Sequence, residues 1–357
     1  MKKPTLHLLG IPHTINSNLY SHCAFTGKTY RFAKMMQAQG YKVIEYGNEG
    51  SESAAEEKVV ILETEKFKEL KTLYEKEYPH EPANMDSTLF KEYNRLLPGA
   101  MMDKVKPGDI ICHPFGIVHQ HLADIFLQAF HVETGIGYNT SWAPYRIFES
   151  YAWWHYHQGK EGRAGHNYEF VIPNYYDLDE WTVNFTPGKY LLYFGRVQDD
   201  KGLHIVKEIA KHTGIETIIC GNGNAESYLS LDIPNLCYMP PIHGRDRDRF
   251  LGNALAILMP TIYTEPFGGS GVEAQLCGTP LISSDHGAFS ETNPNSKLRC
   301  KTLKQWIYAI DYIKRRDIRK TTSTLTRRKY NLQTVGAQYD SAFIQISELN
   351  DKGWYTL

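Results

Sequence analysis

Short, largely apolar runs of strand length alternate with helix-length segments along this chain, and this alternation constrains its fold more than any other feature. Three such runs are residues 190–194, 217–220 and 279–283. Strands that are apolar on both sides are typical of parallel sheets whose two faces are covered by helices. The sequence therefore predicts an α/β fold built on parallel sheets.

The length of 357 residues indicates two domains of ordinary size. An apolar strand ends at Pro173 and is followed by an acidic turn, which marks the expected crossing between the domains. We expect an N-terminal domain over residues 1–173 and a C-terminal domain over residues 174–336. The apolar face of a last helix would allow residues 337–357 to pack back on the first domain.

The composition describes a globular protein without a strongly charged surface overall. Hydrophobic residues make up 42%, and a formal net charge of -1 gives no global attraction for nucleic acid or an anionic membrane. The alternating Arg and Asp residues at 245–249 are interpreted as the solvated start of a surface helix, with a local basic face as the alternative. Six scattered cysteines without a Cys-x-x-Cys pair favour a reducing compartment and no zinc site. No apolar run approaches the roughly 18 residues of a membrane span, so we expect a cytoplasmic protein with no transmembrane segment.

A glycine-rich turn lies between two glutamates in the segment TIYTEPFGGSGVEAQLCGTP. Glu265 and Glu273 are separated by Gly268-Gly269-Ser270-Gly271, which leads directly into a predicted helix. Glycines let the backbone approach a ligand closely, and the first amides of a helix favour an anion. Ionised carboxylates are acceptors suited to sugar hydroxyls. The segment predicts a nucleotide-sugar site, and the plainer alternative is a tight turn with two solvated glutamates.

Two cations follow the first predicted strand of the C-terminal domain. Arg196 lies just beyond that strand, and Lys201 opens the next helix. At the carboxyl ends of parallel strands, two cations five residues apart can face the same crevice. A nucleoside diphosphate needs such positive charge at its phosphates, although a solvated loop explains the same pattern without a ligand.

Together these segments resemble the donor-binding signature of the family 4 glycosyltransferases. The similar parts are YFGRVQDDKGLHIVKEIA and the glutamate segment, with Pro-Phe-Gly after the first glutamate and Cys-Gly-Thr-Pro before an apolar strand. Members of this family are retaining enzymes of the GT-B fold, in which two Rossmann-like domains face each other across a cleft. The resemblance is strongest over residues 190–290 and extends over the N-terminal half to a subgroup encountered in bacteria and phages.

The resemblance implies a role for each of the four charged residues. Arg196 and Lys201 would hold the donor diphosphate and stabilise charge on the leaving group. Glu265 would bind hydroxyls of the transferred sugar near the reacting carbon, and Glu273, in the first helical turn, would bind the ribose hydroxyls. Further donor contacts are implied for Gly195, Gly221, Met239, Phe267, Gly268, Gly269, Ser270, Gly271 and Val272.

The N-terminal domain is expected to hold the acceptor. Family members often place a histidine near the end of a middle strand, in contact with the donor sugar. His113 matches that position best and is included among the catalytic candidates, with His119 as the second choice. Both follow a predicted strand at residues 109–112.

An aromatic run, residues 140–157, has two interpretations. It is either a stacking platform for sugars or bases, or a helix capped by Ser141 with Pro144 in its first turn. The second is favoured, with one face toward a core: Phe148, Tyr151, Ala152 and His155. This run and residues 135–138 carry the resemblance to the bacterial and phage subgroup, which keeps a hydroxymethylated DNA base among the acceptors and the cytoplasm of a host among the locations.

The resulting hypothesis is a retaining, metal-independent hexosyltransferase that uses a nucleoside diphosphate sugar and a hydroxyl acceptor. The acceptor classes left open are a glycan, a lipid-linked molecule, a small molecule and modified DNA. No cofactor is expected, because Arg196, Lys201 and the helix N-terminus would neutralise the diphosphate. The alternatives are a sugar-nucleotide epimerase on the same fold and a non-catalytic nucleotide-sugar-binding protein.

Overall fold

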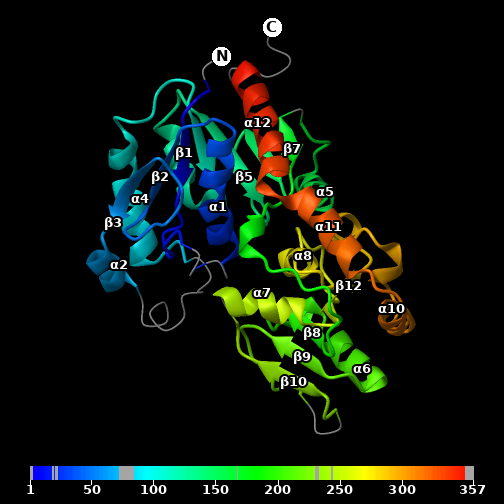
Figure 1. Ribbon diagram of the computed structural model, residues 1–357. Helices are drawn as coiled ribbons and strands as arrows, with labels where there is room; N and C mark the ends of the chain where they lie inside the picture. The colour runs from blue at the N-terminus through cyan, green and yellow to red at the C-terminus, as the bar shows by residue number, and fades with distance from the viewer. Residues whose placement is uncertain are drawn as a thin grey trace. The chain divides into compact units, whose positions relative to one another are not determined.

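The computed structural model describes residues 3–17, 20, 23–71, 84–166, 168–229, 233–242 and 244–349. These residues form two compact units (Figure 1). The N-terminal unit contains the described residues up to Glu149, residues 160–176 and the chain from Leu332 onward. The C-terminal unit contains residues 150–159 and 177–331.

Within the described residues, the N-terminal unit has a seven-stranded parallel sheet in the order β3-β2-β1-β4-β5-β6-β7. The strand order reverses between β1 and β4, which is the point where ligands bind in open α/β sheets. The strands are β1 (Leu6–Leu9), β2 (Val43–Asn48), β3 (Glu57–Leu62), β4 (Ile110–His113), β5 (Phe130–Ile136), β6 (Tyr145–Phe148) and β7 (Glu169–Val171).

Helices cover both faces of this sheet because alternate residues of each strand point to opposite sides. Leu8 lies in a cluster with Phe32 of α1 and Phe343 of α12, whereas Leu9 lies in another with Tyr93 of α4. Figure 1 shows α1 and α12 side by side, although they come from opposite ends of the chain. The helical segments of this unit are α1 (Ala24–Ala38), α2 (Thr64–Leu70), α4 (Thr88–Met101), the 3₁₀ helix η2 (Gly116–Asp124) and α12 (Leu332–Leu349).

The helix α12 packs on α1 through aromatic rings. The ring of Tyr339 lies 5.5 Å from that of Phe32, and the ring of Phe343 lies 5.8 Å from that of Tyr41. Lys3 also donates a hydrogen bond of 2.5 Å to Asp340 of this helix. The last segment of the described chain therefore belongs to the N-terminal unit, while residues 350–357 of the expected return segment lie outside the described residues.

The C-terminal unit has, among its described residues, a six-stranded parallel sheet in the order β10-β9-β8-β11-β12-β13. Its strands are β8 (Leu191–Phe194), β9 (Thr217–Cys220), β10 (Leu236–Met239), β11 (Ala256–Met259), β12 (Leu281–Ser284) and β13 (Arg299–Cys300). The expectation of an α/β fold with parallel sheets is confirmed in both units.

The sheet of the C-terminal unit reverses its strand order between β8 and β11, and helices α6 and α10 pack on one of its faces. The helix α8 lies against β11 and β12, and α11 packs on α8. The helical segments are α5 (Tyr151–Glu161), η3 (Leu178–Glu180), η4 (Asp199–Lys201), α6 (Leu203–Thr213), α7 (Gly244–Gly252), α8 (Gly269–Leu276), α9 (Phe289–Thr292), η5 (Ser296–Leu298), α10 (Leu303–Arg315) and α11 (Arg319–Tyr330).

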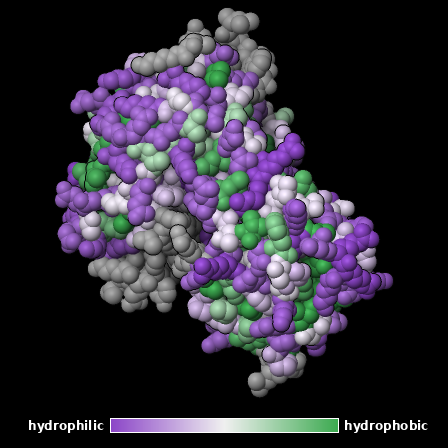
Figure 2. Space-filling view, in the orientation of Figure 1, coloured by the Kyte–Doolittle hydropathy of each residue, from purple (hydrophilic) through white to green (hydrophobic). Residues whose placement is uncertain are grey.

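Hydrophilic side chains cover most of the face shown in Figure 2, with hydrophobic ones interspersed among them. Exposed large hydrophobic residues among those described include Leu127, which is 75% exposed, and Tyr308. Single exposed hydrophobic side chains are ordinary on protein surfaces and indicate no particular partner.

The expected helix over residues 140–157 is wrong in its first half. Residues 145–148 form strand β6, and the helix α5 begins at Tyr151. The hydroxyl of Ser141 is engaged, because it donates a hydrogen bond of 2.8 Å to Glu133. Ser150 caps the helix instead, since its hydroxyl oxygen accepts a hydrogen bond of 3.1 Å from the backbone N–H of Trp153.

The expected core face of this helix is also wrong. Tyr151 is 58% exposed and His155 is exposed, whereas Trp153, His157 and Gln158 are buried. Phe148 is buried as expected, but it lies in β6 and not in the helix, so the four residues do not form one helical face.

Residues 150–159 pack in the C-terminal unit, although the sequence analysis placed them in the N-terminal domain, residues 1–173. The carboxylate of Glu291 accepts hydrogen bonds of 3.0 Å from the backbone N–H groups of Tyr151 and Ala152. The hydroxyl of Ser150 donates a hydrogen bond of 2.7 Å to the carbonyl of Pro266. The later crossing, expected after residue 173, lies between Tyr176 and Asp177.

The packing of α8 on the sheet gives a stability prediction for Gly271. A Cβ atom at this residue would lie 2.8 Å from Met259 Sδ and 2.9 Å from Leu281 Cδ2. We expect Gly271→Ala to lower the free energy of unfolding by about 1–3 kcal/mol, because core side chains would have to shift. Urea unfolding measures this change. As a control, Gly99→Ala in α4, where a Cβ would meet no atom within 4 Å, should stabilise by about 0.5–1 kcal/mol. Equal effects of the two substitutions would contradict the packing argument.

Candidate functional site

Glu265 lies at the centre of a buried polar cluster beyond the carboxyl end of β11. Its Oε2 atom accepts hydrogen bonds from Lys201 Nζ at 2.7 Å, from the Tyr263 hydroxyl at 3.1 Å and from the Thr261 hydroxyl at 3.3 Å. Lys201 also donates a hydrogen bond of 2.5 Å to Tyr263. Among the described residues, none donates to Oε1 of Glu265. One carboxylate oxygen therefore accepts three hydrogen bonds from protein groups, and the other accepts none from the described residues.

The cluster is held in a largely water-free environment. Glu265 is 8% exposed, Lys201 is 9% exposed and Thr261 is 1% exposed. Burial and the nearby Glu265 carboxylate raise the pKa of Tyr263, so its hydroxyl stays protonated and remains a donor. The backbone N–H of Ala288 donates a hydrogen bond of 3.0 Å to the carbonyl of Glu265, which fixes the main chain as well as the side chain.

The glycine-rich turn after Glu265 begins the helix α8. Gly268 has φ 78°, and a Cβ atom there would lie 2.6 Å from Phe289 Cε1, so both conformation and space favour glycine. The carbonyl of Gly268 accepts hydrogen bonds from the N–H groups of Gly271 and Val272. The N–H of Ser270 has no acceptor among the described residues. Several backbone N–H groups of this turn were expected to bind the donor substrate. Among them, the N–H of Ser270 is unengaged by the described residues, whereas those of Gly271 and Val272 already donate hydrogen bonds to Gly268.

Phe267, another expected donor contact, is 3% exposed and packs edge-on against Tyr330, with their rings 5.6 Å apart. This side chain anchors the turn to the end of α11. Its position supports the conformation of the turn rather than supplying ligand surface.

Glu273 was expected in the first turn of the helix, but it lies beyond that turn. The helix begins at Gly269, and its first turn contains no acidic residue. Glu273 is 8% exposed and forms an ion pair through Oε2 with Nη2 of Arg247, on α7. The expectation of a solvated helix start at residues 245–249 is therefore wrong for Arg247, whose side chain is 14% exposed. Arg249 is exposed, and the side chain of Arg245 lies outside the described residues.

Backbone contacts bring the ends of β8, β9 and β10 together. The N–H of Gly195 donates to the carbonyl of Cys220, and the N–H of Gly221 donates to the carbonyl of Met239. A Cβ atom on Gly221 would lie 1.7 Å from the carbonyl oxygen of Gly195, so only glycine fits there. Three of the predicted donor contacts, Gly195, Gly221 and Met239, are therefore neighbours.

Arg196 follows this junction and is exposed. No described residue accepts a hydrogen bond from its guanidinium group. Its positive charge counteracts part of the rise in the pKa of Tyr263 and of Tyr193, both of which are also influenced by Glu265. The charge of Arg196 therefore acts on the same cluster as Lys201, while its side chain remains available for an anion.

The two candidate histidines lie in the N-terminal unit. Both ring nitrogens of His119 have partners, the carbonyl of Gly10 at 3.0 Å and Asn94 Oδ1 at 2.6 Å. His113 Nε2 lies 3.0 Å from His131 Nδ1, and its own Nδ1 is buried with no partner among the described residues. Of the two, His113 alone thus has an unused ring nitrogen.

Burial of His119 makes the stability of the protein depend on pH. Burial lowers its pKa to about 4. Because an unfolded histidine has a pKa of about 6.5, the unfolded chain binds more protons between these values. The stabilisation from the neutral His119 ring is therefore fully present above pH 6.5, and the free energy of unfolding falls by about 3 kcal/mol as the pH falls toward 4.

Urea unfolding from pH 7 to pH 4 measures how the free energy of unfolding depends on pH. This dependence should flatten in His119→Gln and stay unchanged in His212→Gln, whose side chain is 51% exposed.

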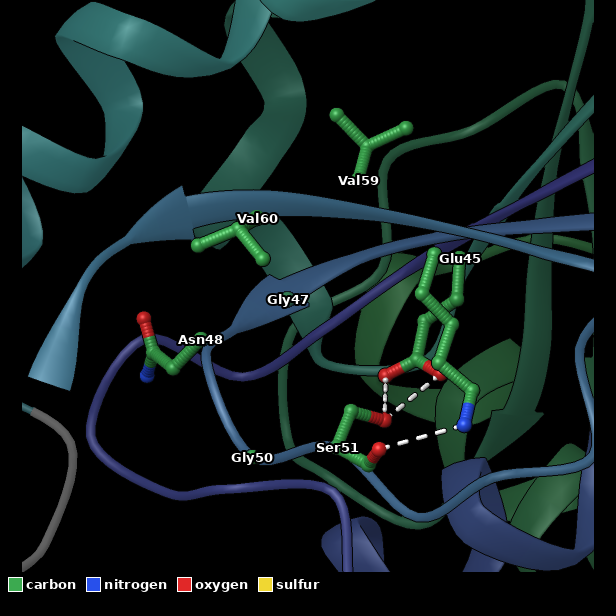
Figure 3. Close-up of a pocket in the computed structure, with 8 residues that line it drawn as sticks. Glu45, Gly47, Asn48, Gly50, Ser51, Val59 and Val60 are labelled. Atoms are coloured by element: carbon green, nitrogen blue, oxygen red, sulfur yellow. Dashed lines mark hydrogen bonds between the residues drawn. The ribbon is translucent and has the colours of Figure 1, made fainter.

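A pocket in the N-terminal unit lies away from these residues (Figure 3). The carboxylate of Glu45 accepts hydrogen bonds of 2.7 and 2.8 Å from the Ser51 hydroxyl, and Lys58 donates one of 3.2 Å to the Ser51 carbonyl. Asn16 and Ser53 also donate to Glu45. These bonds hold the loop after β2, and none of the predicted site residues lines the pocket.

The described residues contain no group of three or more His, Cys, Asp or Glu side chains arranged to hold a metal ion. None of the described helices is both long and apolar enough to span a membrane.

Residues 179–313 match the family model described as "Glycosyl transferases group 1". Over this segment the C-terminal unit therefore resembles the group 1 glycosyltransferases. This segment contains the cluster around Glu265, the glycine-rich turn, Arg196 and the Arg247–Glu273 ion pair.

Two curated glycosyltransferases match the chain over part of its length. It is 29% identical over 116 residues to the D-rhamnosyltransferase WbpZ of Pseudomonas aeruginosa, covering 31% of this chain and 30% of the relative. It is 33% identical over 110 residues to the 2-deoxystreptamine N-acetyl-D-glucosaminyltransferase of Niallia circulans, covering 28% of each. The chain thus spans less than a third of the length of these relatives.

Solved structures resemble the chain over almost its whole length. The sucrose-phosphate synthase of Thermosynechococcus elongatus has a TM-score of 0.68 at 14% identity, covering 96% of this chain and 99% of that protein. Anabaena Alr3699/HepE in complex with UDP-glucose has a TM-score of 0.63 at 14% identity, covering 95% and 99%. The expected GT-B fold is thereby confirmed, while retention and the bacterial and phage subgroup stay predictions.

Proposed function

We propose that this protein transfers a sugar from a nucleoside diphosphate sugar to a hydroxyl acceptor, with retention of anomeric configuration. The observation that carries the proposal is the buried Lys201–Glu265 pair beside a glycine-rich helix start, within the segment that matches the family. Cations and free amide groups bind a diphosphate, and a carboxylate with an unused oxygen binds a hydroxyl.

In this proposal Lys201 and Arg196 bind the diphosphate and stabilise the negative charge that grows on it as the sugar leaves. Lys201 is fixed by Glu265 and Tyr263, so little reorganisation is needed at the moment of reaction. Glu265 uses Oε1 to accept a hydrogen bond from a hydroxyl of the transferred sugar. The free N–H of Ser270 supplies a further donor.

His113 is retained as the proposed contact of the N-terminal unit with the transferred sugar. Its Nδ1 is buried and has no partner among the described residues. Burial lowers its pKa well below the ordinary value, so the ring is neutral near pH 7 and Nδ1 can accept a hydrogen bond. The resemblance assigns this contact, and the unused nitrogen supports it.

The donor is proposed to be a hexose on a nucleoside diphosphate, with uridine compounds as the first to test. Anabaena Alr3699/HepE, which shares the fold, binds UDP-glucose. The reaction is proposed to need no metal, because Lys201, Arg196 and the helix start supply the positive potential. The acceptor classes remain a glycan, a lipid-linked molecule, a small molecule and a hydroxymethylated DNA base, and the proposed location is the cytoplasm.

A calorimetric titration with UDP-, GDP- and ADP-sugars, with and without EDTA, tests the donor half of the proposal. One nucleotide sugar should bind, and EDTA should leave its affinity unchanged. Absence of binding across the panel would refute the proposal.

Incubation of the bound donor with acceptors then separates the activities. Transfer of the sugar supports a glycosyltransferase, and conversion of the sugar nucleotide without an acceptor indicates an epimerase. Binding without either reaction indicates a non-catalytic protein. If duplex DNA is the acceptor, its binding should weaken steeply with salt.

A further inference from the structure

Arg247, on α7, forms an ion pair with Glu273, which is a predicted donor ligand. Its Nη2 atom pairs with Oε2 of Glu273, and both side chains are nearly buried, at 14% and 11% exposure. Its guanidinium carbon lies 5.6 Å from the ring centre of Trp181 and 5.4 Å from that of Phe194. The two aromatic rings and the carboxylate therefore hold the guanidinium group in one place.

This arrangement is poorly explained by stability alone. Burying two charges costs desolvation that their attraction only partly offsets, and apolar side chains of similar size often stabilise a protein more. In addition, Nε of Arg247 is buried without a hydrogen-bond partner among the described residues. A buried donor without a partner adds to this cost.

The ion pair uses only one of the two carboxylate oxygens of Glu273. Arg247 occupies Oε2, and no described residue donates a hydrogen bond to Oε1. Because the guanidinium group of Arg247 is planar and lies close to two aromatic rings, it fixes the rotation of the carboxylate and hence the direction of Oε1. A fixed carboxylate oxygen is an acceptor prepared for a ligand hydroxyl.

We propose that Arg247 is a positioning residue for the nucleoside half of the donor. It holds Glu273 so that Oε1 accepts hydrogen bonds from the ribose hydroxyls. This inference rests on the proposed function, since it takes Glu273 as the ribose ligand. It separates the site into two parts, with Lys201 and Arg196 acting on the diphosphate and Arg247 acting on the ribose through Glu273.

Calorimetric dissociation constants for two ligands test this division of the site. The ligands are the tightest-binding of UDP, GDP and ADP, and the 2′,3′-dideoxy form of the same diphosphate. The variants are Arg247→Met, Glu273→Gln and the double variant, with Arg249→Met as a matched control from the exposed side of α7. The wild type should prefer the ribose form by about tenfold, the usual effect of one hydrogen bond to a charged group.

Arg247→Met and Glu273→Gln should each remove this preference and leave binding of the dideoxy form unchanged. The double variant should be no weaker than Glu273→Gln, because Arg247 acts through Glu273. Arg249→Met should behave as the wild type. If Arg247→Met does not fold, Arg247→Lys takes its place, and it should lose part of the preference because lysine lacks the planar fork.

Three outcomes would overturn the inference. Equal weakening of both ligands by Arg247→Met indicates a general structural role, and additive losses in the double variant indicate direct contact between Arg247 and the nucleotide. An unchanged preference in Arg247→Met removes the role entirely. If the wild type binds none of the three diphosphates, the proposed function itself fails, and that result differs from all three.

Discussion

Glu265→Gln is expected to reduce kcat by about 10²–10³-fold, the usual loss when one preorganised polar contact to the reacting group is removed. Glutamine keeps the size of the side chain but removes the negative charge that pairs with Lys201. The amide also leaves the orientation of Lys201 and Tyr263 less strictly fixed. Initial rates with a saturating nucleotide sugar measure the loss, and circular dichroism checks that the fold is intact.

Glu265→Ala should lose turnover at least as severely, but it leaves Lys201 buried without its carboxylate partner. For that reason the glutamine variant gives the cleaner comparison. Glu208→Gln serves as a control, since Glu208 lies on α6 with its side chain 50% exposed. Near-normal turnover in Glu265→Gln would remove Glu265 from the mechanism.

Lys201→Met is expected to lower kcat/KM for the donor by about 10²-fold or more, because a buried positive charge beside the leaving diphosphate is lost. The KM for the acceptor should change little. Steady-state kinetics with each substrate varied in turn separates the two effects. Arg196→Ala should also impair donor use, since its exposed guanidinium group is free to bind an anion.

Lys211→Ala, an exposed lysine on α6, provides the control for a nonspecific effect of charge. The double variant Lys201→Met with Glu265→Gln adds a stability test. It should unfold at a higher temperature than Lys201→Met, because neither charge is then buried alone. A defect confined to the acceptor in Lys201→Met would contradict the assignment of Lys201 to the diphosphate.

Much of the parallel α/β architecture follows from local sequence patterns. At the start of helix α10, for example, Thr302 and Gln305 form a reciprocal capping box, which is a local signal. Helix α11 was not predicted, because most of its buried positions are polar, namely Arg319, Ser323 and Thr326. Arg319 donates to the carbonyls of Asn184, Gly252 and Ala254, so partners distant in sequence stabilise this helix.

The start of α5 shows a second limit of local patterns. Ser141 and Ser150 are both reasonable helix caps from sequence. The choice between them depends on Glu133 of β5, which engages the hydroxyl of Ser141, and on Glu291, which accepts from the first amides of the helix. Neither partner lies near the helix in the sequence.

The candidate site was only partly predictable for the same reason. The strand-end and glycine patterns identified Arg196, Lys201, Glu265 and Glu273, and the structure joins two of them, Lys201 and Glu265, in one cluster. The pairing of Glu273 with Arg247 depends on the packing of α7 against α8. An alternating Arg and Asp segment gives no local indication that one arginine turns inward.

Residues 150–159 belong to the C-terminal unit although the residues on either side of them belong to the N-terminal unit, and this affects how fragments of the protein can be made. The backbone leaves the N-terminal unit at Glu149, returns at Lys160, leaves again after Tyr176 and comes back at Leu332. A fragment that starts at residue 174 therefore lacks α5, and the Glu291 carboxylate and Pro266 carbonyl lose the hydrogen-bond donors described above. A C-terminal unit produced by itself would need residues 150–159 as an added segment, because no single cut of the chain separates all of its residues from the N-terminal unit.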